Sequence, residues 1–239
     1  MANKNRQEVQ KTDVSNSGES GYCTLSYAEK KVEAIYEFVK SPTNKLYMLF
    51  LNYAVHVFDD ILKNLQTEEP MIHLLRKALN KLLRNVLTRF VKPSAFAMAQ
   101  TVDSVDYKSS YNQKTDQELV IGEDAREGRL KKFYVTVRRY FVSCCDYMIA
   151  KLPLKDELLR PAEAVDVACQ QTSKSSSLTY FLERFPTLLP KGVTNDVIVE
   201  QFISYQSYDI QDYIKKRIDE TWLSIGQLKD EVGNCLFYI

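Results

Sequence analysis

Apolar residues recur at helical spacing along most of this chain. The clearest pattern occupies residues 71–91, where an apolar residue returns every three or four positions. A second stretch, Asn44–Leu65, is apolar over so much of its circumference that it predicts a helix near the centre of the fold. Further helices are predicted at Ser26–Val39, Arg129–Ala150, Ser173–Arg184, Thr194–Tyr208 and Asp212–Leu228. The pattern as a whole predicts a mainly α protein, a bundle of several helices.

Proline and capping residues mark the predicted helix ends. Pro42 forces the preceding serine out of the helical region and so separates the first two helices. Thr67 is expected to cap the next helix, with two glutamates in its first turn and a proline just inside it, and Pro93 to end it. The segment 151–167, KLPLKDELLRPAEAVDV, is expected to form a loop, a short helix and a break marked by Pro161.

The chain divides by composition into a tail and one large helical domain. Residues 1–22 are rich in polar side chains and hold too few apolar groups to form a core, so they are expected to be disordered. Residues 23–239 are expected to form one helical domain, interrupted by a polar loop at about 94–127. Within that loop, the segment Glu118–Ile121 could form a short strand or one turn of helix.

The composition excludes several classes of protein. No segment resembles a signal peptide, and the strongest apolar run, Leu46–Val55, is shorter than the roughly 20 residues that span a membrane. We therefore expect an intracellular protein without a membrane partner. The five cysteines form no Cys-x-x-Cys pair, and neither His56 nor His73 stands at a metal-ligand spacing from them. We expect no disulfide framework, metal, cofactor or small-molecule substrate, and we expect Cys144 and Cys145 to be buried as small apolar side chains.

One predicted helix carries a basic face. Residues 71–92 include no acidic residue, although the net charge of the whole chain is only +1. The basic residues of this stretch are Arg76, Lys77, Lys81, Arg84, Arg89 and Lys92. All except Arg89 are candidates to bind DNA phosphates, with Lys77, Lys81 and Arg84 placed opposite the apolar seam. The same pattern also fits a solvated face, long side chains that cover apolar surface, or a surface for a membrane or protein partner.

Residues suited to catalysis do not form a recognisable group. Carboxylates occur in the adjacent pairs Asp59–Asp60, Glu68–Glu69, Glu123–Asp124 and Asp219–Glu220. Neighbours on a helix point about 100° apart, so no pair is expected to converge on one metal ion. A metal-dependent nuclease built on Asp59, Asp60 or Glu123 is the enzymatic alternative. Trp222, the single tryptophan, is expected to anchor the last predicted helix to the core.

Eight segments in a fixed order resemble the hAT superfamily of transposon-derived proteins. They are LYMLFL, LQTEEPMIHLL, RFVKPS, ELVIG, FYVTVRRYFVSCCDYMIAKLPLKDELL, YFLERFPTLLP, QFISYQSYDI and RIDETWLSIGQLKD. Each segment alone is unspecific, and the resemblance rests on their shared order from about Ile35 to the C-terminus.

The resemblance implies a helical domain that is inserted in a ribonuclease-H-like fold. In that family two aspartates precede the insertion and a glutamate follows it, and these carboxylates hold the metal ions that cut and join DNA. The chain is expected to begin after the second aspartate and to stop, at GNCLFYI, before the glutamate, so no residue inherits a catalytic role. Glu118–Ile121 and the C-terminal CLFYI would be remnant strands, with CLFYI exposed as an apolar, aggregation-prone tail.

The expected function is therefore non-enzymatic. The resemblance implies an interaction domain in the nucleus that contacts the DNA backbone or packs against other transposase-like chains. Two alternatives remain open. One is an active metal-dependent DNA transposase or nuclease, and the other is a helical protein–protein scaffold with no role in nucleic-acid binding.

Overall fold

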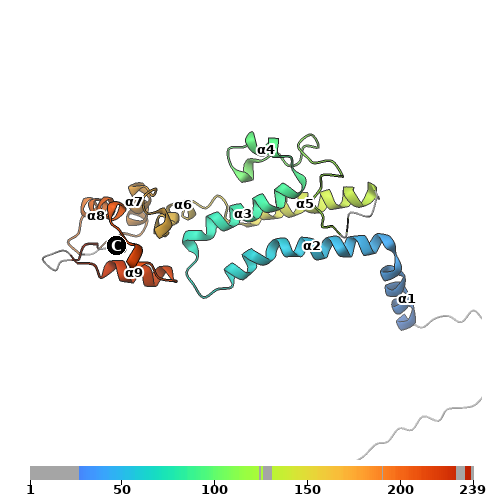
Figure 1. Cartoon of the computed structure of the whole chain (residues 1–239), viewed down its shortest axis with the longest axis horizontal. Helices are drawn as coiled ribbons and strands as arrows, with labels where there is room; N and C mark the ends of the chain where they lie inside the picture. The colour runs from blue at the N-terminus through green and yellow to red at the C-terminus, as the bar shows by residue number, and fades with distance from the viewer. Residues whose placement is uncertain (1–26, 124, 126–130, 190, 230–234, 238–239) are drawn as a thin grey trace, which may run out of the picture. The chain divides into compact units, whose positions relative to one another are not determined.

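The computed structural model describes residues 27–123, 125, 131–189, 191–229 and 235–237 (Figure 1). The predicted disordered tail, residues 1–22, lies outside this part of the chain, as does the start of the predicted helix Arg129–Ala150. The chain forms two structural units, residues 1–44 and 45–239, which are described separately. Helices dominate the described residues, so the predicted mainly α class is confirmed.

The first unit contains helix α1 (Tyr27–Lys40) and the start of α2 (Pro42–Leu65). Ser41 between them is not helical, as the proline that follows it predicts. Helix α2 begins at Pro42 itself, two residues before the predicted start. A proline fits there because the first amide of a helix has no acceptor within the helix.

Helices α2, α3 (Ile72–Phe90) and α5 (Lys131–Lys151) build the main core of the second unit (Figure 1). Helix α3 buries one face, on which Leu83, Leu87 and Phe90 have no exposed surface. Aromatic rings join the three helices. The ring of Phe90 stacks on that of Phe141 with centroids 5.5 Å apart, and Phe50 of α2 meets Phe141 edge-on at 5.6 Å.

The polar loop after α3 is held to this core by short elements. It contains helix α4 (Pro93–Ala97) and the 3₁₀ turn η1 (Val102–Ser104). The predicted strand at Glu118–Ile121 is wrong, and the alternative of one helical turn holds only at its start, where the Glu118 and Leu119 amides donate to the Thr115 carbonyl (both 3.2 Å). Only one backbone bond joins this segment to α3, from the Val120 amide to the Arg89 carbonyl (3.0 Å), so no ladder forms, although Leu119 and Ile121 are buried.

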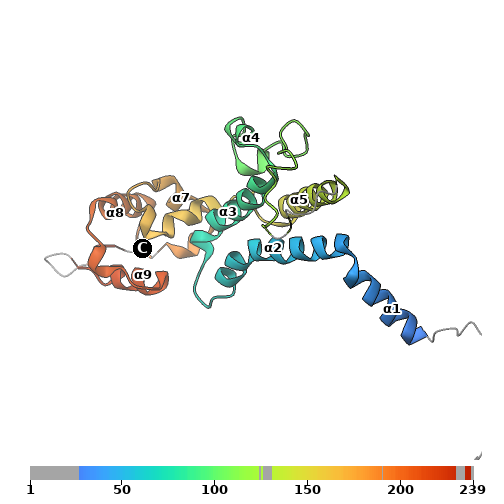
Figure 2. The ribbon, with the colours of Figure 1, turned by 45° about the vertical axis from the view of Figure 1, so that its right-hand side comes forward.

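A second, smaller core lies among the C-terminal helices (Figure 2). These are α6 (Leu159–Ala162), α7 (Ser175–Arg184), α8 (Asn195–Ser207) and α9 (Ile218–Gly226), with the 3₁₀ turns η2 (Glu163–Val165), η3 (Val167–Cys169), η4 (Pro186–Leu188) and η5 (Gln211–Tyr213). Trp222 on α9 packs on the ring of Tyr205 at 5.2 Å, and its indole N–H donates to the Val165 carbonyl (2.8 Å). The predicted anchoring role of Trp222 is confirmed.

The C-terminal segment is part of this second core rather than an exposed tail. Phe237 is 3% exposed and meets the ring of Tyr205 at 5.9 Å. The Leu236 amide donates to the Leu228 carbonyl (2.9 Å), and an isolated bridge joins Cys235 to Lys229. Neither this segment nor any other described residue belongs to a β-strand. The predicted exposed apolar tail is therefore wrong for Leu236 and Phe237, and the last two residues lie outside the described chain.

Several predicted helix ends are also wrong, because side chains make contacts that spacing does not show. Thr67 does not cap α3. Its hydroxyl donates to the Asn64 carbonyl near the end of α2, and α3 starts only after Met71. The last helix starts at Ile218 rather than Asp212, because the buried Thr221 hydroxyl accepts the Lys215 amide (2.8 Å).

Two prolines in the second half of the chain differ in their effect on the neighbouring helices. Pro161 lies inside the short helix α6 and does not break it, since a proline in the first turn costs no hydrogen bond within the helix. Pro186 follows the end of α7 as predicted. Cys145 is buried, as predicted, and Cys144 is half-buried.

Replacement of Phe90 by alanine tests the main core. The Phe90→Ala variant should lose about 3–5 kcal/mol of unfolding free energy, because it leaves a cavity beside Phe141. Denaturant unfolding followed by circular dichroism measures this loss. The control is Tyr147→Ala on α5, where the side chain is 67% exposed, and its unfolding free energy should change little. Equal losses in the two variants would contradict the described core.

Candidate functional site

Helix α3 positions the predicted basic residues. Its apolar face is fixed against the main core, so the basic side chains must project from the other side. The sequence predicts one continuous basic face. The structure divides that face into three groups with different surroundings: one is paired with carboxylates, one lies at a pocket, and one is hydrogen-bonded to neutral groups of the protein.

The first group, Arg76 and Lys77, ties α3 to the 3₁₀ turns that follow α6. One guanidinium nitrogen of Arg76 donates to both carboxylate oxygens of Glu163 at 3.1 and 3.2 Å. The Lys77 ammonium donates to Asp166 at 2.9 Å and to the sulfur of Cys169 at 3.1 Å. These two predicted DNA-binding residues therefore have a structural role, because their charges are already paired within the protein.

The charges of Lys77 and Asp166 stabilise each other. The hydrogen bond to Asp166, followed by that to Cys169, holds the pKa of Lys77 well above its usual value. Burial acts to raise the pKa of Asp166, but the hydrogen bonds from Lys77 and from the Ala168 amide outweigh it and leave that pKa below its usual value. The pair is therefore charged near neutral pH. The sequence pattern did not predict this ion pair, because its two partners lie 89 positions apart in the chain.

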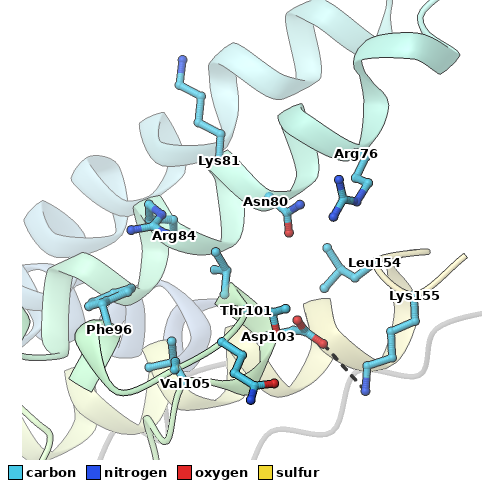
Figure 3. Close-up of a pocket in the computed structure, with 13 residues that line it drawn as sticks. Arg76, Asn80, Lys81, Arg84, Phe96, Thr101, Asp103, Val105, Leu154 and Lys155 are labelled. Carbon is cyan, nitrogen blue, oxygen red and sulfur yellow. Dashed lines mark ion pairs between the residues drawn. The ribbon is translucent and has the colours of Figure 1, made fainter. Parts of the chain in front are cut away.

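The second group, Lys81 and Arg84, lies beside a pocket of about 580 Å³. The pocket is found between α3 and the segment from α4 to η1 (Figure 3). Its basic lining consists of Arg76, Lys81, Arg84 and Lys155. Asp103 is its acidic residue and pairs with Lys155 at 3.7 Å. The remaining lining is partly amide and hydroxyl and partly apolar: Asn80, Gln100, Thr101, Phe96, Ala99, Val102, Val105 and Leu154.

Lys81 and Arg84 are the pocket cations that form no ion pair among the described residues. The Arg84 guanidinium lies 5.4 Å from the centroid of the Phe96 ring, a cation–π contact that holds it at the pocket wall. Lys81 is exposed, and Figure 3 shows its ammonium pointing away from Asp103 and Lys155. Lys81 and Arg84 are therefore two cations at the wall and rim of this pocket that no described carboxylate neutralises.

The third group, Arg89 and Lys92, packs against the protein away from this pocket. Arg89 donates to the carbonyl and the side chain of Asn85, both at 3.1 Å, and lies 5.3 Å from the Tyr53 ring. Lys92 donates to the Tyr111 carbonyl at 2.6 Å. Of the five predicted residues, the structure thus brings Arg76, Lys81 and Arg84 to one pocket and places Lys77 and Lys92 elsewhere.

Other parts of the chain complete the pocket in a way that the sequence did not suggest. Gln100, Thr101 and Lys155 come from loops with no motif, and Lys155 is 81% exposed at its side chain. A lone lysine in a polar loop resembles many solvated lysines, so no sequence signal separates it from them.

The acidic residues that were considered as metal ligands do not come together in the described part of the fold. No three His, Cys, Asp or Glu side chains within the described ranges come together in a way that could hold a metal ion. Asp59 pairs instead with Nδ1 of His56 at 2.6 Å, and Asp60 and Glu123 are placed apart from any such group. Asp219 pairs with Arg217 (2.8 Å), and Asp124 lies outside the described residues.

His73 is a buried residue near the Lys77–Asp166 pair, and it is 6% exposed. Burial lowers its pKa below 6.5 and outweighs the opposing effect of Asp166, while Lys77 lowers the pKa further. A histidine that is kept neutral inside the fold serves packing.

The comparisons with known proteins add no relative. No family model, curated protein or solved structure matches the chain. Within the described residues, none of the helices has both the length and the apolar character needed to cross a membrane.

Substitution of Lys77 should affect stability. Lys77→Met leaves the Asp166 carboxylate without its partner, and because Lys77 is half exposed we expect a loss near the lower end of about 1–3 kcal/mol. Lys81→Met on the same helix removes a lysine without an ion pair and should change the unfolding free energy by less than about 0.5 kcal/mol. Chemical denaturation of both variants provides the comparison, and a larger loss for Lys81→Met would contradict this division of the basic face.

The stability should also depend on pH through His73. Its folded pKa is lowered, so the unfolded state binds a proton that the folded state does not, and the unfolding free energy should fall as the pH drops below about 6.5. His73→Leu should flatten this dependence between about pH 7 and pH 5. An unchanged slope in His73→Leu would show that other groups cause the dependence.

Proposed function

We propose that this protein is a non-catalytic interaction domain that contacts nucleic-acid phosphates at the pocket beside α3. Lys81 and Arg84 are the residues that bind the phosphates. The single observation that carries the proposal is a pocket with two cations that no described acidic group neutralises.

The chemistry of the lining supports a phosphate ligand. An arginine guanidinium and a lysine ammonium both donate charge-assisted hydrogen bonds to phosphate oxygens, and Arg84 is already held in place by Phe96. The side chains of Asn80, Gln100 and Thr101 add neutral donors at the same wall. Backbone contacts of this kind bind without reading the base sequence, so we expect low sequence specificity.

The resemblance to hAT transposases supplies the biological context of the proposal. It favours DNA over RNA as the ligand, the nucleus as the location, and other transposase-like chains as further partners. Nuclease activity is not part of the proposal. Metal-dependent nicking of DNA by the purified protein, lost on substitution of Asp59, Asp60 or Glu123, would support the enzymatic alternative instead.

A DNA-binding titration at several salt concentrations tests the proposal. Lys81→Ala/Arg84→Ala should weaken binding of a duplex, and should reduce the slope of log K against log salt by about 2, because two phosphate contacts are lost. The matched control is Lys151→Ala/Lys174→Ala, which removes the same formal charge at exposed lysines outside the pocket. That pair should leave the slope nearly unchanged.

Circular dichroism of each variant verifies that it is folded. An absence of DNA binding in the folded wild-type protein would refute the proposal. Equal losses in the pocket variant and the control variant would also refute it, because they would indicate a general charge effect rather than a site.

A second candidate function, a helical protein–protein scaffold, is favoured by a different observation. Helix α2 exposes large apolar side chains away from the pocket, including Met48, Val55 and Leu62, each at least 50% exposed. Salt-insensitive binding to a protein, without binding to DNA, would select this function over the first.

A further inference from the structure

Helix α2 has a second apolar face that is largely exposed; among its members only Phe58 packs in part against the main core. Its core face consists of Phe50, Ala54, Val57 and Ile61. The second face, named here the α2 stripe, consists of Met48, Leu51, Val55, Phe58, Leu62 and Leu65. Phe58 is half-buried, and the other members are between 42% and 57% exposed. Single exposed apolar residues are normal on a protein, but a continuous row of them marks an interface.

The spacing of the α2 stripe is that of a coiled-coil seam. Its members are separated by three, four, three, four and three residues, the alternation that keeps one edge of a helix facing a partner helix. The stripe includes no charged or polar residue, and it extends over about 27 Å of helix at 1.5 Å per residue. A partner helix that lies along α2 is the shape that fits this row.

We propose that the α2 stripe is a homodimer interface, on which the α2 helix of a second copy packs in antiparallel orientation. A two-fold axis between Val55 and Phe58 would place Val55 of each copy opposite Phe58 of the other. The same axis pairs Met48 with Leu65 and Leu51 with Leu62. Every apolar member thus meets an apolar member, which is the self-complementarity that a two-fold interface requires.

Charge at the two ends of the stripe selects the antiparallel orientation. Lys45 precedes the stripe, and Glu68 and Glu69 follow it. An antiparallel pair brings each Lys45 to the end that carries the other copy's glutamates, whereas a parallel pair gathers two lysines at one end and four glutamates at the other. In an antiparallel pair the dipoles of the two helices also point in opposite directions, so that the positive end of each helix lies beside the negative end of the other.

The residues that flank the stripe also limit its occupant. Asn52, Asp59 and Gln66 line its outer edge, opposite the core face. Lys63 lies on the same edge, and a polar edge of mixed charge suits the rim of a protein interface. The α2 stripe shares no residue with the pocket beside α3, so this inference does not rest on the proposed nucleic-acid function.

The oligomeric state of the full chain tests the inference. Sedimentation equilibrium over a range of concentrations should show a reversible monomer–dimer equilibrium for the wild type. Leu51→Glu/Leu62→Glu places charges opposite each other across the two-fold axis and should raise the dimer Kd by about 100-fold or more. The matched control is Leu223→Glu on α9, a leucine that is 66% exposed and outside the stripe, and its Kd should equal that of the wild type.

Cross-linking tests the orientation. Cys23 and Cys235 are first replaced by serine, since Cys235 is an exposed thiol, and single cysteines are then introduced as Leu51→Cys and Leu62→Cys. Oxidation of an equal mixture, with one variant carrying a size tag, should form mainly the mixed 51–62 disulfide. Each variant alone should cross-link poorly.

Several outcomes would overturn the inference. A wild-type protein that stays monomeric at every concentration would exclude the homodimer. A dimer that survives Leu51→Glu/Leu62→Glu with normal circular dichroism would use another surface. Efficient 51–51 and 62–62 cross-linking would show a parallel pair and refute the antiparallel arrangement.

Discussion

The burial of one face of α3 is the constraint on which the rest of the structure depends. Leu83, Leu87 and Phe90 have no exposed surface, and the stacked rings of Phe90 and Phe141 lock α3 against α5. A helix that is fixed in this way cannot rotate, because rotation would expose apolar side chains to water. The direction of every basic side chain on α3 follows from this packing. The pocket beside α3 therefore depends on the apolar core for its geometry.

The ion pairs of α3 give a structural role to two side chains of a type that also binds phosphates. Arg76 and Lys77 are bonded to Glu163 and Asp166, and these bonds connect the helix that builds the main core to the turns that precede the second core. A cation that is already hydrogen-bonded to a carboxylate must lose that bond before it can bind a phosphate. Under the proposed function, a phosphate would therefore bind to the basic residues that have no carboxylate partner among the described residues.

Helix α2 carries apolar side chains both on its core face and on an exposed face. Phe50 and Ala54 face the core, while Met48 and Val55 point to the other side of the helix. The sequence predicted a single wide apolar face and a central helix, because periodicity alone counts apolar positions without knowing how many are covered. The number of neighbours that α2 has in the fold decides which of those positions are available to a partner.

The sequence by itself determined the helical class, the approximate span of most helices and the concentration of positive charge on α3. These properties depend on residues three or four positions apart, which a periodic pattern records directly. The tertiary structure decided the rest. It placed Asp166 beside Lys77, buried Phe237 and closed the pocket with Lys155. Such contacts join residues that are far apart in the chain. A local pattern does not specify which distant side chains will be in contact, so these contacts are determined only by the packing of the folded chain.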